Sequence, residues 1–132
     1  MTVLVVVLLG GVGAATRFVV DGAVRARRGT AFPVATMTIN VTGSLLLGLL
    51  TGAHLFHGLG SLTLAAGATG FCGGYTTFST AMVETVHLVQ AGETRRAVVS
   101  ALGTLVLCVA AAALGVGVLW LAAGLSPGPV PG

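Results

Sequence analysis

Asn40 is the one amide inside its long apolar segment, and the polar residues near it bear hydroxyl groups. These neighbours are Thr36, Thr38, Thr42 and Ser44. A side-chain amide in such a segment either joins two helices through a hydrogen bond or faces a solute that passes through the protein. The sequence alone leaves both roles open for Asn40.

A second polar group lies in a later apolar segment, at residues 70–80, and reads Gly-Phe-Cys-Gly-Gly-Tyr-Thr-Thr-Phe-Ser-Thr. This density of glycine and hydroxyl residues predicts an interruption of a helix. Carbonyl groups freed by such a break suit a hard cation, and the hydroxyl groups offer donors to an anion. The hydroxyl residues are Thr76, Thr77, Ser79 and Thr80. The alternative is a glycine kink that only lets helices pack closely.

Two further polar features lie in apolar segments. Ser100, Thr104 and Cys108 recur every four residues, so on a helix they share one face, which is either a weakly polar track or a seam of small residues. Glu84 is the one acid well inside an apolar segment, where a carboxylate is costly and is therefore a functional candidate. Its position a few turns before Arg95 equally allows a snorkelling or vestibule role.

The composition indicates that all of these residues belong to a membrane protein. Charged residues make up 7% of the chain, the mean hydropathy is +1.06, and 21 of the 132 residues are glycine. Soluble globular domains have about 25% charged residues, so a soluble domain could not present this surface to water. Because one membrane crossing takes roughly 20 apolar residues, the chain has room for four crossings with short connections.

The pattern therefore predicts an all-α membrane protein with a single domain at residues 1–125. The expected transmembrane helices cover about residues 3–18, 33–53, 61–90 and 97–123. We expect the third helix to be broken near residues 71–79, at about the middle of the membrane. Residues 126–132 are rich in Pro and Gly, which predicts a disordered tail.

All six positive residues are arginines, and all lie in or beside the first or third connection. They are Arg17, Arg25, Arg27, Arg28, Arg95 and Arg96. By the positive-inside rule both connections are cytoplasmic, and both termini lie outside. We therefore expect a multi-pass protein of the plasma membrane, in contact with lipid, with no nucleic-acid partner and no enzymatic activity.

Taken together, these stretches resemble the Fluc (CrcB) family of small fluoride channels. The resemblance extends from about Gly10 to Cys108, and its most specific part is the group at residues 70–80. Further matches are Gly13 and Ala14 with Arg17 in the first helix, and Asn40 followed by Gly43, Ser44 and Gly48 in the second.

The resemblance implies a fluoride-specific channel that exports fluoride from the cytoplasm by passive flow and so lowers its toxicity. It also implies an antiparallel dimer of the dual-topology type, with two pores near the interface. A central sodium ion, structural and not transported, would be held by the backbone carbonyls of Gly73 and Thr76.

The same resemblance implies which residues line the fluoride path. They are Thr36, Asn40, Thr77, Phe78, Ser79, Ser100, Thr104 and Cys108, with Arg17 and Glu84 in vestibule or structural roles. Fluoride is small and strongly hydrated. The electropositive edge of the Phe78 ring and the amide of Asn40 can partly replace its water without a fixed charge that would trap the ion.

Three features depart from the family pattern. Members usually have a second phenylalanine and a tyrosine where this chain has Ala81 and Ser100. The six arginines on one side should also fix a single orientation in the membrane, whereas an antiparallel homodimer needs one sequence to insert both ways. We therefore expect either a homodimer or, as the departures favour, one subunit of a heterodimer with an oppositely oriented paralogue.

Two other functions stay open at this stage. A small four-helix multidrug or metabolite exporter would also be an antiparallel dimer, but it ordinarily needs an intramembrane carboxylate in the first helix, which this chain lacks. A non-transporting membrane assembly subunit would need only the glycine-rich faces and would leave Asn40 without a task.

Overall fold

The computed structural model describes residues 1–125, and every regular element among them is helical. The elements are α1 (Thr2–Arg28), α2 (Val34–His57), α3 (Ser61–Leu64), the π-helix η1 (Ala65–Cys72), α4 (Gly73–Tyr75), α5 (Phe78–Gln90) and α6 (Thr94–Leu125). The expected tail at residues 126–132 lies outside the described residues. The prediction of an all-α protein is confirmed for the part that the structure describes.

Three of the helices, α1, α2 and α6, are long and apolar enough to cross a membrane. This confirms the prediction of a membrane protein. The stretch expected as one further crossing, residues 61–90, is divided among α3, η1, α4 and α5. None of these pieces reaches the length of a crossing by itself, because the longest, α5, has 13 residues.

The helix α1 extends well beyond Phe18, the end predicted from the apolar pattern. It continues to Arg28 and stops at Gly29, whose φ of 73° is readily adopted only by glycine. The ion pair between Arg25 and Asp21, four residues apart, stabilises the added turns. Charged residues thus end the membrane-crossing stretch without ending the helix.

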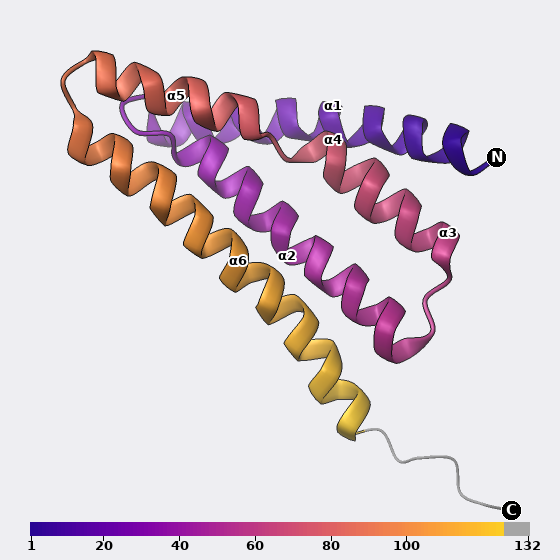
Figure 1. Ribbon diagram of the computed structural model, residues 1–132. Helices are drawn as coiled ribbons and strands as arrows, with labels where there is room; N and C mark the ends of the chain where they lie inside the picture. Colours follow the sequence, from indigo (N-terminus) through magenta and orange to yellow (C-terminus); the bar gives the residue numbers. More distant parts are fainter. Residues whose placement is uncertain (126–132) are drawn as a thin grey trace, which may run out of the picture.

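The helices form two packed groups that meet along the third segment of the chain. The helices α2 and α6 lie side by side and run in the same direction, with the most extensive contact in the subunit (Figure 1). The helix α1 packs against η1 and α4, while α5 continues beyond the break and lies along α6. The first half of the third segment is therefore enclosed by neighbours, and its second half is a single helix at the edge.

Glycine permits backbone-to-backbone contact within both groups. A Cβ atom on Gly74 would collide with the carbonyl oxygen of Gly10 in α1, and one on Gly48 would collide with the carbonyl oxygen of Ala112 in α6. Close approach of this kind is how membrane helices associate, since lipid supplies no hydrophobic drive between them. The stretch of α1 around Gly10 is thus in contact with α4.

Few side chains are buried in this thin subunit. Ile39 and Thr36 of α2 are the largest side chains that are fully buried among the described residues. The helix α5 has no buried residue at all, and Phe78 at its start is 77% exposed. The apolar side chains that remain exposed are available to lipid or to a second protein chain.

Candidate functional site

The third segment is interrupted between α4 and α5 by two extended residues. Thr76 has φ −77° and ψ 158°, and Thr77 has φ −148° and ψ 115°. The amide and the hydroxyl of Thr76 both donate to the carbonyl of Cys72, at 2.9 Å each, which closes the last turn of α4. The helix α5 then begins at Phe78, and the hydroxyl of Thr77 accepts the amide of Thr80 at 3.2 Å as an N-terminal cap.

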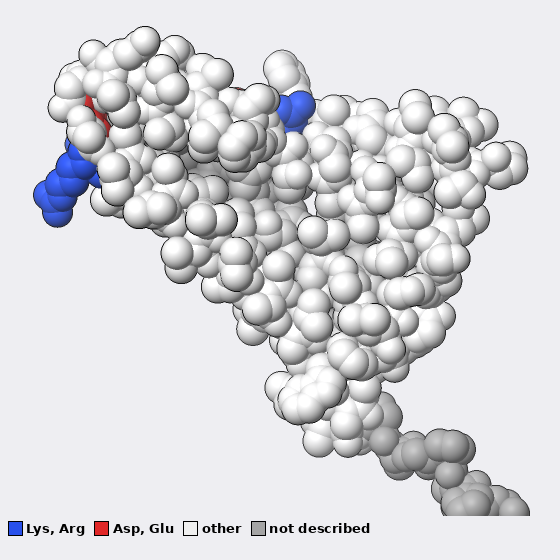
Figure 2. Space-filling model, in the orientation of Figure 1, with Lys and Arg blue, Asp and Glu red and all other residues white. Residues whose placement is uncertain are grey.

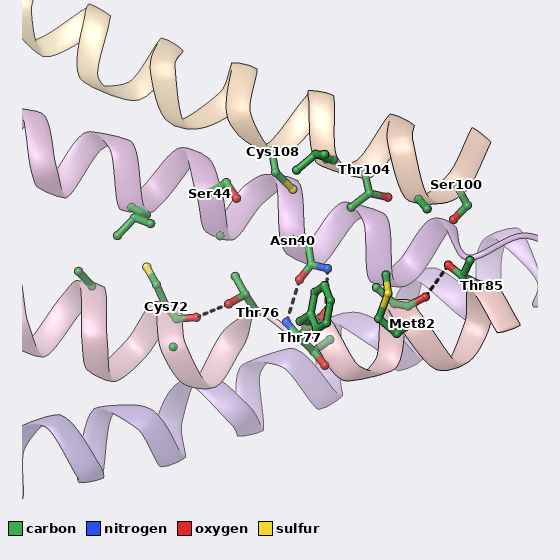
Figure 3. A pocket seen from close by; sticks show the side chains of 18 residues that line it. Asn40, Ser44, Cys72, Thr76, Thr77, Met82, Thr85, Ser100, Thr104 and Cys108 are labelled. Carbon is green, nitrogen blue, oxygen red and sulfur yellow. Dashed lines mark hydrogen bonds between the residues drawn. The ribbon is translucent and has the colours of Figure 1, made fainter. Parts of the chain in front are cut away.

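The side chain of Asn40 binds the peptide groups of Thr77 on both sides. Its Nδ2 donates to the Thr77 carbonyl at 2.9 Å, and its Oδ1 accepts the Thr77 amide at 2.8 Å. Figure 3 shows both bonds running from α2 to the break. Of the two roles left open by the sequence, Asn40 therefore has the first, joining two helical segments, and it also lines a cavity.

These bonds divert amides that a continuous helix would use for its own carbonyls. In an α-helix the amide of residue i donates to the carbonyl of residue i−4. The Thr77 amide would serve Gly73 but bonds Asn40, and the Thr80 amide would serve Thr76 but bonds the Thr77 hydroxyl. The break thus releases the carbonyls of Gly73 and Thr76, and Gly73 is exposed at the surface of the subunit.

A cavity of about 390 Å³ lies between the break, α2 and α6 (Figure 3). It contains most of the residues expected along the fluoride path: Asn40, Thr77, Phe78, Ser100, Thr104 and Cys108. No charged residue of the described chain lines it. We call it the neutral cavity. Its polar lining also includes Ser44 and Thr85, which were not expected on the fluoride path, although Ser44 lies one turn after Asn40 on the same face.

A second cavity, of about 290 Å³, lies on the α1 side of the break, and we call it the charged cavity. Arg17, Asp21, Arg25 and Thr36 line it together with Thr77, which lines the neutral cavity as well. The Nε of Arg17 and the hydroxyl of Thr36 are buried there, and neither has a hydrogen-bond partner among the described residues. Thr36 and Asn40 therefore line different cavities, and Thr77 lies between them.

Phe78 and Ser79 begin α5 with little cover. The ring of Phe78 lines the neutral cavity although the residue is 77% exposed, so it forms part of the rim. Ser79 lines neither of the two cavities, and its hydroxyl lies 3.4 Å from that of Thr77. The structure therefore brings together all the expected path residues except Thr36 and Ser79.

The carboxylate of Glu84 pairs with Arg25 of α1 rather than with the nearer residue in sequence, Arg95. The guanidinium of Arg25 lies 2.7 Å from Glu84 and 2.7 Å from Asp21, so one arginine holds two carboxylates. The side chain of Glu84 is only 17% exposed. This ion pair joins α1 to α5. The sequence signalled only the Asp21–Arg25 pair of this cluster, since these two residues are spaced to share a helix face.

No group of three or more His, Cys, Asp or Glu side chains that could hold a metal occurs within residues 1–125. A metal at the break would therefore depend on oxygen ligands from the backbone. Carbonyl oxygens are ligands that hard cations accept, and the released carbonyls of Gly73 and Thr76 are of this kind.

Comparison with known proteins gives consistent matches. The profile of a family described as "CrcB-like protein, Camphor Resistance (CrcB)" matches residues 4–116. "Fluoride-specific ion channel FluC 1" of Leifsonia xyli is 47% identical over 131 residues, covering 99% of this chain and 93% of the relative. "Fluoride-specific ion channel FluC 2" of Cutibacterium acnes is 45% identical over 116 residues, covering 87% and 94%. The FluC channel of Geobacter sulfurreducens is 42% identical over 108 residues, covering 81% and 87%.

Proposed function

The chain belongs to the CrcB family of fluoride-specific ion channels, and from that premise we propose that the two cavities beside Thr77 form its route for fluoride. The protein is a membrane channel that passes fluoride, and it is not an enzyme. Flow is passive, and its direction out of the cytoplasm lowers the internal fluoride concentration.

The observation that carries this route is the division of charge between the two cavities. The charged cavity offers the unpartnered Nε of Arg17 and hydroxyl of Thr36, which can receive an anion that arrives with its water. The neutral cavity offers hydroxyl groups, the amide of Asn40 and the ring edge of Phe78. Attraction followed by weak, uncharged contacts lets an ion enter and leave again.

The remaining path residues extend this route along α6. Ser100, Thr104 and Cys108 lie on one face of α6, and all three line the neutral cavity. Ser100 is buried, and the other two are half-buried. Their spacing of one turn gives fluoride successive polar contacts along the helix, with no fixed charge at which the ion would stop.

A structural sodium ion would bind at the released carbonyls of Gly73 and Thr76. Diversion of the Thr77 and Thr80 amides supports this site, and so does the exposure of Gly73 at the surface of the subunit. Two carbonyls are too few for a sodium ion, so a second subunit would supply the rest. The sodium would then bridge the two breaks and stabilise the dimer without being transported.

The functional assembly is a dimer of antiparallel subunits, in which the break is close to the middle of the membrane. The absence of buried residues on α5 and the exposure of Phe78 support a partner at this edge. Figure 2 shows the charged side chains of one face gathered mainly where α1 ends and α6 begins. By the positive-inside rule this end is cytoplasmic and the termini are outside, in the plasma membrane.

The partner is either an identical chain or an oppositely oriented paralogue. Four arginines, Arg27, Arg28, Arg95 and Arg96, are exposed at the charged end and favour one orientation. Ala81 and Ser100 both line the neutral cavity, where a larger ring would fill more of it. Both observations favour a paralogue that supplies the missing contacts.

Fluoride efflux from liposomes tests the function. Purified protein is reconstituted with internal potassium fluoride, and efflux is started with valinomycin while an electrode records external fluoride. We expect fast efflux of fluoride and far slower efflux of chloride at equal concentration. Equal efflux of both anions would contradict a fluoride-specific channel, and no efflux from either the chain alone or the chain with its paralogue would contradict any channel.

A further inference from the structure

We infer that Asn40 is a positioning residue for the break: its side-chain amide holds the peptide groups of Thr77 and thereby sets where α5 and the Phe78 ring begin. The inference rests on the proposed function, since it assigns Asn40 a task in fluoride passage beyond lining the cavity. It follows from the two hydrogen bonds to Thr77 and from the weak packing of α5.

The bonding capacity of the Asn40 amide is half used by Thr77. A side-chain amide has two N–H donors and two lone pairs on its oxygen. One donor serves the Thr77 carbonyl at 2.9 Å, and one lone pair accepts the Thr77 amide at 2.8 Å. One N–H is left for the neutral cavity, which Asn40 lines. The bonds to Thr77 hold this remaining N–H in a fixed direction.

Only an amide side chain can hold Thr77 in this way. The peptide of an extended residue presents both a donor and an acceptor, and neither has a helical partner here. Aspartate could accept the Thr77 amide, but its second oxygen would then face the Thr77 carbonyl and repel it. Leucine would leave both groups buried without partners. The need to bond both peptide groups of Thr77 therefore explains why residue 40 is asparagine, without any contact with fluoride.

The position of Phe78 depends on this contact because little else holds the start of α5. No residue of α5 is buried, and its tie to α1 is the Glu84–Arg25 pair, nearly two turns further along. Phe78 follows Thr77 directly, so a shift of the Thr77 peptide moves the ring that lines the neutral cavity. A displacement of about 1 Å is enough to spoil a geometry that depends on contact distances.

Thr77 is also shared by the two cavities. It lines the neutral cavity with Asn40, and it lines the charged cavity with Thr36 and Arg17. The Asn40–Thr77 contact therefore forms part of the wall between the cavities. Loosening it changes the passage from one cavity to the other as well as the position of Phe78, so selectivity should change together with rate.

An ester substitution separates positioning from direct contact with fluoride. Thr77 is replaced by its α-hydroxy acid, which removes the N–H that donates to Asn40 Oδ1 and leaves every side chain in place. The substitution also turns the Thr76 carbonyl into a weaker ester carbonyl, so the dimer is measured as well, and an unchanged dimer excludes an effect through the proposed sodium site. We expect fluoride efflux to fall by about tenfold or more and the preference for fluoride over chloride to weaken. The matched control is the α-hydroxy acid of valine at Val106, which is exposed on α6 and lines neither cavity. It also loses one backbone amide and should keep both values.

Unchanged efflux and selectivity in the Thr77 ester would overturn the inference, because Asn40 would then act through fluoride alone. A second measurement does not depend on the ester folding. The Thr77 amide should exchange slowly with deuterium in the unmodified protein and faster in Asn40→Ala, whereas the Thr76 amide, bonded to Cys72, should be the same in both. Fast exchange at Thr77 in the unmodified protein would also overturn it. A lack of fluoride efflux from unmodified channels would instead refute the proposed function and leave the exchange result intact.

Discussion

The body of the subunit and the helix α5 are held in place by different interactions. In the body, α2 packs on α6 and α1 packs on η1 and α4, with glycines such as Gly48 and Gly74 in backbone contact with their neighbours. In α5 no residue is buried, and polar contacts at Thr77 and Glu84 supplement its packing on α6. The chain thus fixes one part by close packing and the other by a few directional contacts.

This difference assigns separate tasks to the two parts. Close-packed helices resist change, because their contacts can be lost only together. A helix held by a few polar contacts keeps its direction and leaves its side chains available to a cavity and to a partner chain. Substitutions in the body should therefore have the largest effects on folding, and substitutions at the start of α5 should affect transport first.

The largest effect should come from Gly74, the second of two adjacent glycines in α4. Gly74→Val places side-chain atoms against the backbone of α1 at Gly10, and we expect a loss of more than about 3 kcal/mol or no folded protein. A Cβ atom on Gly73 meets nothing closer than the Ala68 carbonyl at 4.0 Å, so we expect the subunit to fold with Gly73→Val. Thermal melting of the purified protein in detergent measures both.

Gly73→Val should nevertheless weaken the dimer, because it crowds a carbonyl proposed to bind sodium. Gly22→Ala is the control, since Gly22 has open space around it and alanine favours a helix. Equal melting temperatures for the Gly74 and Gly73 variants would show that the body is not fixed by backbone contact at Gly74. An unchanged dimer with unchanged transport in Gly73→Val would remove the sodium site.

Phe78→Ile should give the next largest effect, and it should fall on transport alone. The residue is 77% exposed, so the free energy of unfolding of the subunit should change by less than about 0.5 kcal/mol. Isoleucine has no electropositive ring edge, and fluoride efflux should fall by about tenfold or more. Efflux from liposomes and thermal melting are measured on the same preparation. If Phe78→Ile releases fluoride as fast as the unmodified protein, the ring has a packing role only.

A smaller effect is expected when the tie between α5 and α1 is cut. Glu84→Gln removes the charge that pairs with Arg25 in a partly buried place, and we expect a loss of about 1–2 kcal/mol in unfolding free energy. Glu93→Gln is the matched control, because the Glu93–Arg96 pair is more exposed and worth less than about 1 kcal/mol. Equal losses in the two variants would mean that α5 is held by its packing on α6 instead.

The sequence predicted the parts of this structure that depend on local pattern. Long apolar runs predicted the crossings α1, α2 and α6, and the four-residue spacing predicted that Ser100, Thr104 and Cys108 share a face. Their common cavity with Asn40 and Phe78 was expected from the resemblance to a family, and no spacing along the chain could have given it. The cavity depends on how α6 packs alongside α2.

Contacts between distant residues were beyond the reach of the sequence. Glu84 was compared with Arg95, which is close along the chain, whereas it pairs with Arg25, 59 residues away. The end of α1 was placed near Phe18, since the apolar pattern stops there, but the ion pair of Asp21 with Arg25 continues the helix to Arg28. The first difference arises because Glu84 finds its partner in three dimensions, and the second because charged side chains end the apolar pattern without ending the helix.

The smallest expected effect concerns Ala81 of α5, which stands where family members usually have a second phenylalanine. Ala81 is half-buried and lines the neutral cavity one turn after Phe78, so a larger ring at this position would fill part of that cavity. In the chain expressed alone, Ala81→Phe should raise the preference for fluoride over chloride by about threefold, because a narrower cavity admits less water with the ion. Reconstitution with both anions measures this ratio.

The gain should stay small in the chain expressed alone, because a new ring does not change which way the chain inserts. The four exposed arginines remain at the charged end of the subunit. By the positive-inside rule we expect most copies to keep a single orientation, so antiparallel pairs of identical chains should stay rare. Side-specific labelling of tags on both termini measures the fraction in each orientation. If unmodified chains label equally from both sides and conduct fully, the heterodimer is excluded, and Ala81→Phe should then have no effect, since a homodimer that works without the ring has no gap to fill.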